Sequence, residues 1–280
     1  MEQKSVLITG CSSGIGHCLA HGLKQRGYRV FATARQTTDV ESLTTAGFAS
    51  FPLDLDSSSS IRTAVETVLA RTQGQLYALI NNGAYGQPGA VEDLSRAALR
   101  AQFETNVFGT QELTNLVIPT MRAQGEGRII QISSILGIVC FAYRGAYNAS
   151  KFALEALSDT IRLELRGTNI HVSLIEPGPI TSRFRANAHA AFKRHIDQEH
   201  SVHREYYARV EKRLEGPKPM PFTLPPEAVL KQVIKALEAR RPKARYAVTF
   251  PTTLFAVLRR ILPVRALDSI LSAVSNSGQR

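Results

Sequence analysis

The sequence predicts an α/β fold in which helices cover both faces of a doubly wound parallel sheet, within a single domain that spans residues 1–280. Two observations carry this prediction. Short apolar segments alternate with longer helical segments from residue 4 to residue 178, and such alternation is typical of βαβ units. A glycine-rich segment, TGCSSGIG, also stands where the first strand passes into the first helix, where the backbone must turn tightly.

The expected elements follow one another in a regular order. Apolar runs predict strands over residues 4–10, 28–35, 48–55, 76–82, 128–134 and 170–178. Helical periodicity predicts helices over residues 15–26, 40–46, 57–71, 95–121 and 147–166. A serine run at 57–60 supplies the N-cap of the third helix. Because the strands are separated by helices, we expect them to be parallel and buried on both faces.

The regular alternation ends after Pro179. Residues 183–226 are rich in His, Arg, Lys and Tyr and finish in a proline-rich stretch, and a helix over 226–240 and a strand over 245–250 follow. The last expected element is an apolar and basic amphipathic helix over 252–273, which Pro263 interrupts. This C-terminal extension either packs on the protein or on a partner subunit, which we favour, or lies on a membrane surface.

The composition is that of a globular protein, with 44% hydrophobic and 20% charged residues. The first residues do not have the pattern of a signal peptide, and no apolar stretch reaches the roughly 18 residues of a spanning helix. Cys11, Cys18 and Cys140 lack metal-ligand spacing and fit reduced thiols. We therefore expect a cytoplasmic protein.

The net charge of +11 suits phosphate groups, nucleic acid or an anionic membrane face. The basic residues form no recognisable nucleic-acid module, so we expect no nucleic-acid partner. Four histidines, at 189, 195, 200 and 203, lie in the variable segment. Solvated loop histidines are far more common than metal ligands, so we expect no metal site.

Glycines 10, 14 and 16 of the TGCSSGIG segment predict a phosphate-binding loop. They let the backbone approach a diphosphate, which the N-terminus of the following helix favours electrostatically. The second strand ends in Arg35, with no acid before Asp39, although an acid there would bind the free ribose hydroxyl of NAD. An arginine at this place can bind a 2′-phosphate, with Ser13 as a second donor. We therefore expect NADP(H) as the cofactor.

The most informative pair of residues is Tyr147 and Lys151, four apart in AYNASKFALEAL. At this spacing they project from one face of a helix. An ammonium favours the phenolate of a nearby phenol, whose free pKa is roughly 10, and one such charge can lower that pKa by about 3 units. We therefore expect Lys151 to lower the pKa of Tyr147. Ser134, thirteen residues before the tyrosine, could hold a carbonyl oxygen beside it.

Seven segments in order resemble motifs of the short-chain dehydrogenase/reductase family, from Lys4 to about residue 181: TGCSSGIG, LDLD, INNGAYG, TNVFG, QISSILG, AYNASK and EPGPITS. The resemblance implies a Rossmann fold. One departure is that Gly83 precedes Ala84 where the family has Ala before Gly, which puts a contact near the adenosine ribose in doubt. The finer likeness is to the branch of 17β-hydroxysteroid and retinol dehydrogenases and of bacterial NADP-dependent aldehyde reductases.

The resemblance implies four catalytic roles. Tyr147 would be the general acid in reduction and the base in the reverse reaction. Ser134 would hydrogen-bond the substrate oxygen, and Lys151 would lower the pKa of the tyrosine and bind the nicotinamide ribose. Asn106 would position a water that touches Lys151.

The resemblance also implies the cofactor contacts. Asp54 would bind the adenine amine, and Thr181 with the backbone of Ile180 would hold the carboxamide. The full expected set is Gly10, Ser12, Ser13, Gly14, Ile15, Gly16, Arg35, Asp54, Leu55, Asn82, Gly83, Tyr147, Lys151, Pro177, Gly178, Ile180 and Thr181.

In this family the segment after the sixth strand usually covers the substrate, so residues 183–226 are the expected lid. Phe184 would either line the binding site of an apolar ligand or pack the lid onto the body of the protein. Tyr143 is expected to border the pocket. Arg144, together with Arg183 and Arg185, leaves open a substrate with an acidic group.

The function expected from these features is the NADP(H)-dependent, reversible reduction of an apolar aldehyde or ketone. A non-catalytic NADP-binding regulator is an alternative, although such relatives usually lack the tyrosine or the lysine. A dehydrogenase that works mainly in the alcohol-oxidising direction is another. The resemblance implies a homodimer or homotetramer built through the helices at 95–121 and 147–166, and the basic extension leaves peripheral membrane contact open.

Overall fold

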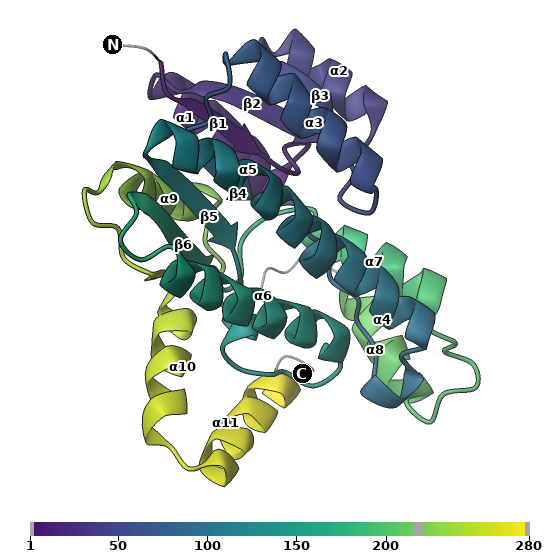
Figure 1. Cartoon of the computed structure of the whole chain (residues 1–280). Helices are drawn as coiled ribbons and strands as arrows, with labels where there is room; N and C mark the ends of the chain where they lie inside the picture. The colour runs from purple at the N-terminus through teal and green to yellow at the C-terminus, as the bar shows by residue number, and fades with distance from the viewer. Residues whose placement is uncertain (1–2, 215–220, 278–280) are drawn as a thin grey trace.

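The computed structural model describes residues 3–214 and 221–277 and contains one seven-stranded parallel sheet (Figure 1). The strand order is β3-β2-β1-β4-β5-β6-β7. This confirms the doubly wound α/β fold. The order of the strands reverses direction between β1 and β4, and ligands of such sheets bind in the crevice at the carboxyl ends of the strands on either side of this point.

The strands are short and overlap the predicted segments, and β5 begins one residue before its predicted segment. They are β1 Ser5–Ile8, β2 Arg29–Ala34, β3 Ala49–Pro52, β4 Ala78–Asn81, β5 Gly127–Ile132, β6 Ile170–Glu176 and β7 Arg245–Ala247. The α-helices are α1 Gly14–Gln25, α2 Thr37–Thr45, α3 Ser58–Arg71, α4 Arg96–Phe103, α5 Thr110–Gln124, α6 Gly145–Glu164, α7 Phe184–His195, α8 Arg204–Leu214, α9 Glu227–Glu238, α10 Phe250–Ile261 and α11 Val264–Ser277.

Helices cover both faces of the sheet, because alternate side chains of each strand point to opposite sides. On β1, Val6 joins the core formed with α1 and α9, which includes Leu19 and Val233. Its neighbour Leu7 joins the core formed with α3, α5 and α6, which includes Leu113. Both faces are therefore apolar, as the continuous hydrophobic runs of the strands predict.

The long helix predicted over 95–121 is wrong in one respect. It is divided by a π-helical segment, Glu104–Gly109, between α4 and α5. The wider turn brings Gly109 against the loop after β3, where an added Cβ would lie 1.8 Å from the carbonyl oxygen of Leu55. Apolar periodicity alone does not reveal this close approach. Such π segments are often found at functional sites.

The C-terminal part also differs in detail from the predictions. The strand expected over 245–250 ends at Ala247, because Thr249 caps α10 by accepting a hydrogen bond from the backbone of Thr252 and Pro251 occupies its first turn. The helix predicted over 252–273 is two helices, α10 and α11, which meet near Pro263 and form a hairpin on the outside of the body (Figure 1).

The segment predicted to be a lid, residues 183–226, contains α7 and α8, and its residues 215–220 lie outside the described part of the chain. Among the helices of residues 3–214 and 221–277, none is long and apolar enough to cross a membrane.

Candidate active site

The structure brings Ser134, Tyr147 and Lys151 together at the carboxyl end of β5. Ser134 lies two residues after the end of β5, and Tyr147 and Lys151 lie on the first two turns of α6. All three are buried. The hydroxyl of Ser134 acts to lower the pKa of Tyr147, and the ammonium of Lys151 lies 5.7 Å from the centre of the tyrosine ring. A phenol, a hydroxyl and an ammonium therefore converge on one point.

The electrostatic balance at Tyr147 differs from the predicted one. Burial raises its pKa to about 12, while the hydrogen bond with Ser134 and the charge of Arg144 act to lower it. Burial also lowers the pKa of Lys151 to about 8, and the nearby carboxyl of Glu155 acts to raise it. The ammonium of Lys151 donates to the carbonyl oxygen of Ile132 at 2.8 Å. Desolvation therefore outweighs the effect that the charge of the lysine was expected to have.

Asn106 lies in the π-helical segment and connects two parts of the site. Its amide nitrogen donates to the carbonyl of Tyr85 at 3.0 Å and to the hydroxyl of Ser150 at 3.1 Å. Its oxygen accepts from the backbone of Tyr85 at 3.2 Å. Because Ser150 precedes Lys151, Asn106 fixes the loop after β4 against the turn of α6 that carries Lys151.

The loop between β1 and α1 leaves no room for a side chain at its glycines. A Cβ on Gly16 would lie 2.1 Å from the carbonyl oxygen of Gly10, and Gly10 itself has a φ of +69°. The amide of Asn82 donates to the carbonyls of Thr9 and Gly10 at 2.9 and 3.0 Å. Gly83 donates its N–H to Thr9 at 2.7 Å. The loop therefore presents bare backbone in a fixed shape, as the approach of a phosphate requires.

Gly83, the departure from the family pattern, lies against the same loop. A Cβ there would lie 3.2 Å from both the Leu55 side chain and the hydroxyl of Thr9. The glycine therefore fits a tight contact between the loops after β1, β3 and β4.

The other predicted nucleotide contacts lie at the same edge of the sheet. Ser13 is the N-cap residue of α1, and its hydroxyl makes no capping hydrogen bond. Arg35 is exposed directly after β2. Asp54 is partly buried after β3 and accepts a hydrogen bond from the backbone of Asp56. Ile15 is partly buried against the core of this face.

The segment after β6 closes this edge. The carbonyl of Pro177 accepts from the backbone of Ile135 at 2.8 Å, and a Cβ on Gly178 would lie 2.2 Å from Thr249. The backbone of Thr181 donates to the carbonyl of Leu224 at 3.0 Å, and Ile180 forms a bridge with the same residue.

This segment also reaches the glycine loop. A Cβ on Gly14 would lie 2.8 Å from the Cβ of Ser182, and Arg183 donates to the carbonyl of Ser12 at 3.3 Å. The residues predicted to hold the nicotinamide and those predicted to hold the phosphates are therefore neighbours.

Of the three predicted substrate residues, two lie beside the tyrosine. The rings of Phe184 and Tyr147 pack edge to face, 5.3 Å apart. With Arg144 and Gly86 they line a cavity of about 10 Å³, which leaves little space over the phenol. Tyr143 points elsewhere and stacks at 3.6 Å on Tyr206 of α8.

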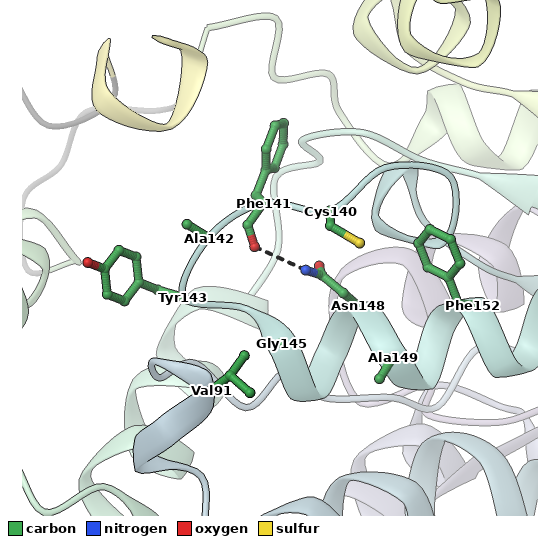
Figure 2. Close-up of a pocket in the computed structure, with 9 residues that line it drawn as sticks. All are labelled: Val91, Cys140, Phe141, Ala142, Tyr143, Gly145, Asn148, Ala149 and Phe152. Carbon is green, nitrogen blue, oxygen red and sulfur yellow. Dashed lines mark hydrogen bonds between the residues drawn. The ribbon is translucent and has the colours of Figure 1, made fainter. Parts of the chain in front are cut away.

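A larger cavity, about 380 Å³, lies on the other side of α6 (Figure 2). Its wall on α6 is formed by Asn148, Ala149 and Phe152, which the spacing of the helix turns away from Tyr147 and Lys151. The amide of Asn148 donates to the carbonyl of Phe141 at 3.0 Å across this cavity (Figure 2). This cavity is therefore separate from the group of Ser134, Tyr147 and Lys151.

A partly buried cluster of charged side chains behind Lys151 was not predicted from the sequence. The guanidinium of Arg245 lies 3.0 Å from Glu155 and 2.6 Å from Asp159, both on α6, and 3.2 Å from Glu176 at the end of β6. Burial raises the pKa of Glu155, and raises that of Glu176 to about 7. The only signal in the sequence is that Glu155 and Asp159 follow Lys151 at intervals of four.

Comparison with known proteins agrees with this geometry. Residues 4–192 match the short chain dehydrogenase family. The uncharacterized oxidoreductase YbbO of Escherichia coli is 45% identical over 96% of this chain and 94% of its own. The NADPH-dependent 1-acyldihydroxyacetone phosphate reductase of Schizosaccharomyces pombe is 33% identical over 73% of this chain and 69% of its own.

A solved structure is similar over the whole chain. A short-chain dehydrogenase from Streptomyces avermitilis superimposes with a TM-score of 0.78 at 29% identity, over 99% of this chain and 96% of the other. The family match covers more than half of the chain, and it includes the glycine loop as well as Ser134, Tyr147 and Lys151. With its parallel sheet and its buried group of Ser134, Tyr147 and Lys151, the chain belongs to the short-chain dehydrogenase/reductase family of oxidoreductases.

Proposed function

We propose that this oxidoreductase uses NADP(H) to reduce an apolar aldehyde or ketone to the alcohol, reversibly. The observation that carries the proposal is the convergence of Ser134, Tyr147 and Lys151 in a buried site whose wall is the ring of Phe184. Such a group can hold a carbonyl oxygen and deliver a proton to it in a dry environment.

The residues of the glycine loop fit a dinucleotide. The space over Gly16 and Gly10 admits backbone but no Cβ, and the hydroxyl of Ser13 is not used in capping. These groups would hold the diphosphate, and Arg35, exposed at the end of β2, would bind the 2′-phosphate that distinguishes NADP(H). When bound, the cofactor supplies the hydride.

The protonation state of Tyr147 suits reduction. A pKa of about 12 keeps the phenol protonated at neutral pH, so it can give its proton to the oxygen of the substrate as negative charge develops there. Ser134 donates a hydrogen bond to the same oxygen. Lys151 places a positive charge beside the phenol that stabilises the phenolate left behind.

Asn106 is proposed to act by holding neighbouring parts of the site in position. Its bonds to Tyr85 and Ser150 hold the loop after β4 against the turn of α6 that carries Lys151. This supports a steady distance between the lysine and the tyrosine.

The substrate is proposed to carry an apolar chain and an acidic group. Phe184 provides an apolar wall, and Arg144, on the rim of the same small cavity, provides a positive charge. The reductase relative from Schizosaccharomyces pombe, which acts on an acylated phosphate ketone by its name, supports this substrate class.

We also infer a homodimer or homotetramer through the outer side of α5 and α6. Phe108, just before α5, and Leu163 on α6 are about half exposed, and burial of such side chains against a second copy would stabilise the assembly. Light scattering measures the assembly directly.

The test is the oxidation of NADPH and of NADH by the full chain, followed by nicotinamide absorbance, with a panel of aldehydes, ketones and acyl phosphate ketones. We expect turnover with NADPH that Tyr147→Phe reduces by about a thousandfold. Tyr28→Phe, on the far side of the sheet from this group, serves as the matched control. No turnover in the whole panel, or full activity of Tyr147→Phe, would contradict the proposal.

A further inference from the structure

The outer face of the helix α10 is apolar and exposed. Its exposed residues recur at intervals of four, three and four and so form one stripe along the helix. They are Phe250, Leu254, Val257 and Ile261. The inner face, which includes Thr252 and Phe255, is buried against the body. The stripe is therefore not part of the core.

The stripe continues at both ends of the helix. Before α10, the exposed ring of Phe222 packs on Phe250 with ring centres 5.8 Å apart. After it, Val264 at the start of α11 is 73% exposed, and Ile261 at the end of α10 is 67% exposed. These two aliphatic side chains stand at the tip of the hairpin, where the helices turn. A row of exposed apolar side chains of this length usually marks a surface that binds a partner.

Positive charge accompanies the tip. Between residues 250 and 277 the chain has three arginines and one acid, Asp268. Arg259 is turned inward, where it donates to the carbonyl of Ile138 and packs at 4.9 Å on the ring of Phe152. Arg260 and Arg265 are exposed on either side of the two tip residues. Arginines that alternate with exposed aliphatic side chains are typical of segments that lie at a membrane interface.

The positive charge also favours an anionic lipid surface over a second copy of the chain as the partner of the hairpin. The chain carries a net charge of +11, so a contact between the tips of two copies would bring arginines of the same sign together, which costs free energy. An anionic lipid surface attracts each arginine and at the same time accepts the aliphatic side chains.

We propose that the hairpin α10–α11 docks on an anionic lipid surface, with Ile261 and Val264 inserted between the acyl chains and Arg260 and Arg265 at the headgroups. The inner side of the hairpin packs in one apolar cluster with Tyr147, through Phe255 and other residues. Docking therefore holds the body of the protein, and the segment that follows Ser134, close to the lipid. This proposal does not depend on the reaction proposed above.

The test is sedimentation of the full chain with vesicles of phosphatidylcholine alone and with vesicles that contain about a third phosphatidylglycerol. We expect binding to the anionic vesicles, little binding to the neutral ones, and release by salt. Two double variants, Ile261→Ser with Val264→Ser and Arg260→Gln with Arg265→Gln, should each weaken binding by about tenfold or more.

Matched controls test whether vesicle binding depends on the residues of the tip or on any exposed apolar or basic side chains. Val91→Ser with Val202→Ser removes two other exposed apolar side chains, and Arg122→Gln with Arg166→Gln removes two other exposed arginines. Both should bind the anionic vesicles like the wild type. Circular dichroism checks that each variant is folded.

Three results would overturn the proposal. The wild type could remain in the supernatant with anionic vesicles, or both tip variants could bind as tightly as the wild type. The tip variants could also change the mass measured by light scattering without any vesicle binding, which would make the hairpin a subunit contact. Because no substrate is present, failure of this test leaves the proposed reductase activity untouched, and failure of the activity test leaves this one standing.

Discussion

The guanidinium of Arg245 on β7 lies 3.0 Å from the carboxylate of Glu155, which stands one helical turn after Lys151. The same guanidinium contacts Asp159 on α6 and Glu176 on β6. One side chain therefore joins the helix that carries the tyrosine and the lysine to the strand that leads into the predicted nicotinamide segment. Two of its partners, Glu155 and Glu176, are buried carboxyls.

Loss of Arg245 should destabilise the protein in a way that depends on pH. Arg245→Met leaves Glu155 and Glu176 buried without their cation, and removing one partner of a buried pair costs about 3 to 5 kcal/mol. The folded pKa of Glu176 is raised to about 7, above its value in the unfolded chain. Its carboxyl is neutral below that pH, whereas the partly exposed Asp159, whose pKa Arg245 acts to lower, stays ionised. The loss of unfolding free energy should therefore be smaller near pH 5 than near pH 8.

Urea unfolding at the two pH values measures this difference. Arg162→Met is the matched control, since its partner Asp159 is only partly buried, and it should cost less than about 1 kcal/mol. An equal loss for Arg245→Met at both pH values would show that the carboxyls do not carry the effect.

Glu155 should affect the reaction through Lys151. The carboxyl of Glu155 acts to raise the pKa of Lys151, which burial lowers to about 8. Glu155→Gln removes that charge, so the pKa of the lysine falls further and its ammonium is lost at lower pH. We expect the alkaline limb of the kcat profile to move to lower pH, with activity near pH 8 reduced about threefold.

The pH profile of carbonyl reduction, taken with saturating cofactor, measures this shift. Glu164→Gln, at the far end of the same helix, is the control and should keep the wild-type profile. A change in rate without any movement of the limb would assign Glu155 a role in packing only.

Arg35 should decide between the two nicotinamide cofactors. Arg35→Ala removes the charge-assisted bonds expected for the 2′-phosphate, which together are worth about 1.5 to 3 kcal/mol, so KM for NADPH should rise by about ten- to a hundredfold while KM for NADH stays constant. Arg29→Ala is the control, because Arg29 is exposed at the opposite end of the same strand. An unchanged KM for NADPH would remove Arg35 from the cofactor site.

Phe184 should limit the size of the substrate. Its ring packs on Tyr147, and a Cβ on Gly86 would lie 2.7 Å from it, so the space beside the phenol is small. Phe184→Ala should raise kcat/KM for bulky carbonyls by about tenfold relative to small ones. Phe222→Ala, which shortens an exposed ring outside this cavity, should leave the ratio unchanged. A constant ratio in Phe184→Ala would place the substrate elsewhere.

Features set by local spacing were predictable from the sequence. The interval of four residues is enough to place Tyr147 and Lys151 on one helix face. Gly10 and Gly16 predict a tight turn at positions that cannot carry a side chain. The strands of the sheet are continuous apolar runs because both faces are covered, and this pattern is visible without the structure. These are consequences of geometry over a few residues.

Features that depend on distant packing were not predictable in this way. Arg245 is 90 residues from Glu155, and nothing near either of them in the sequence indicates the contact. The pKa of Tyr147 depends on how completely the surrounding elements exclude water, and the spacing to Lys151 contains no such information. The π-helical turn at Asn106 brings Gly109 against the backbone of Leu55, and this contact with another loop cannot be read from the local sequence.

The contact between Gly14 and Ser182 joins two parts of the site that are far apart in the sequence. Ser182 packs against Gly14, the first residue of α1, and stands two residues before Phe184, the ring that covers Tyr147. The segment after β6 therefore touches the predicted phosphate loop at one residue and the cover of the phenol two residues later. The two halves of the site share this one short stretch of chain.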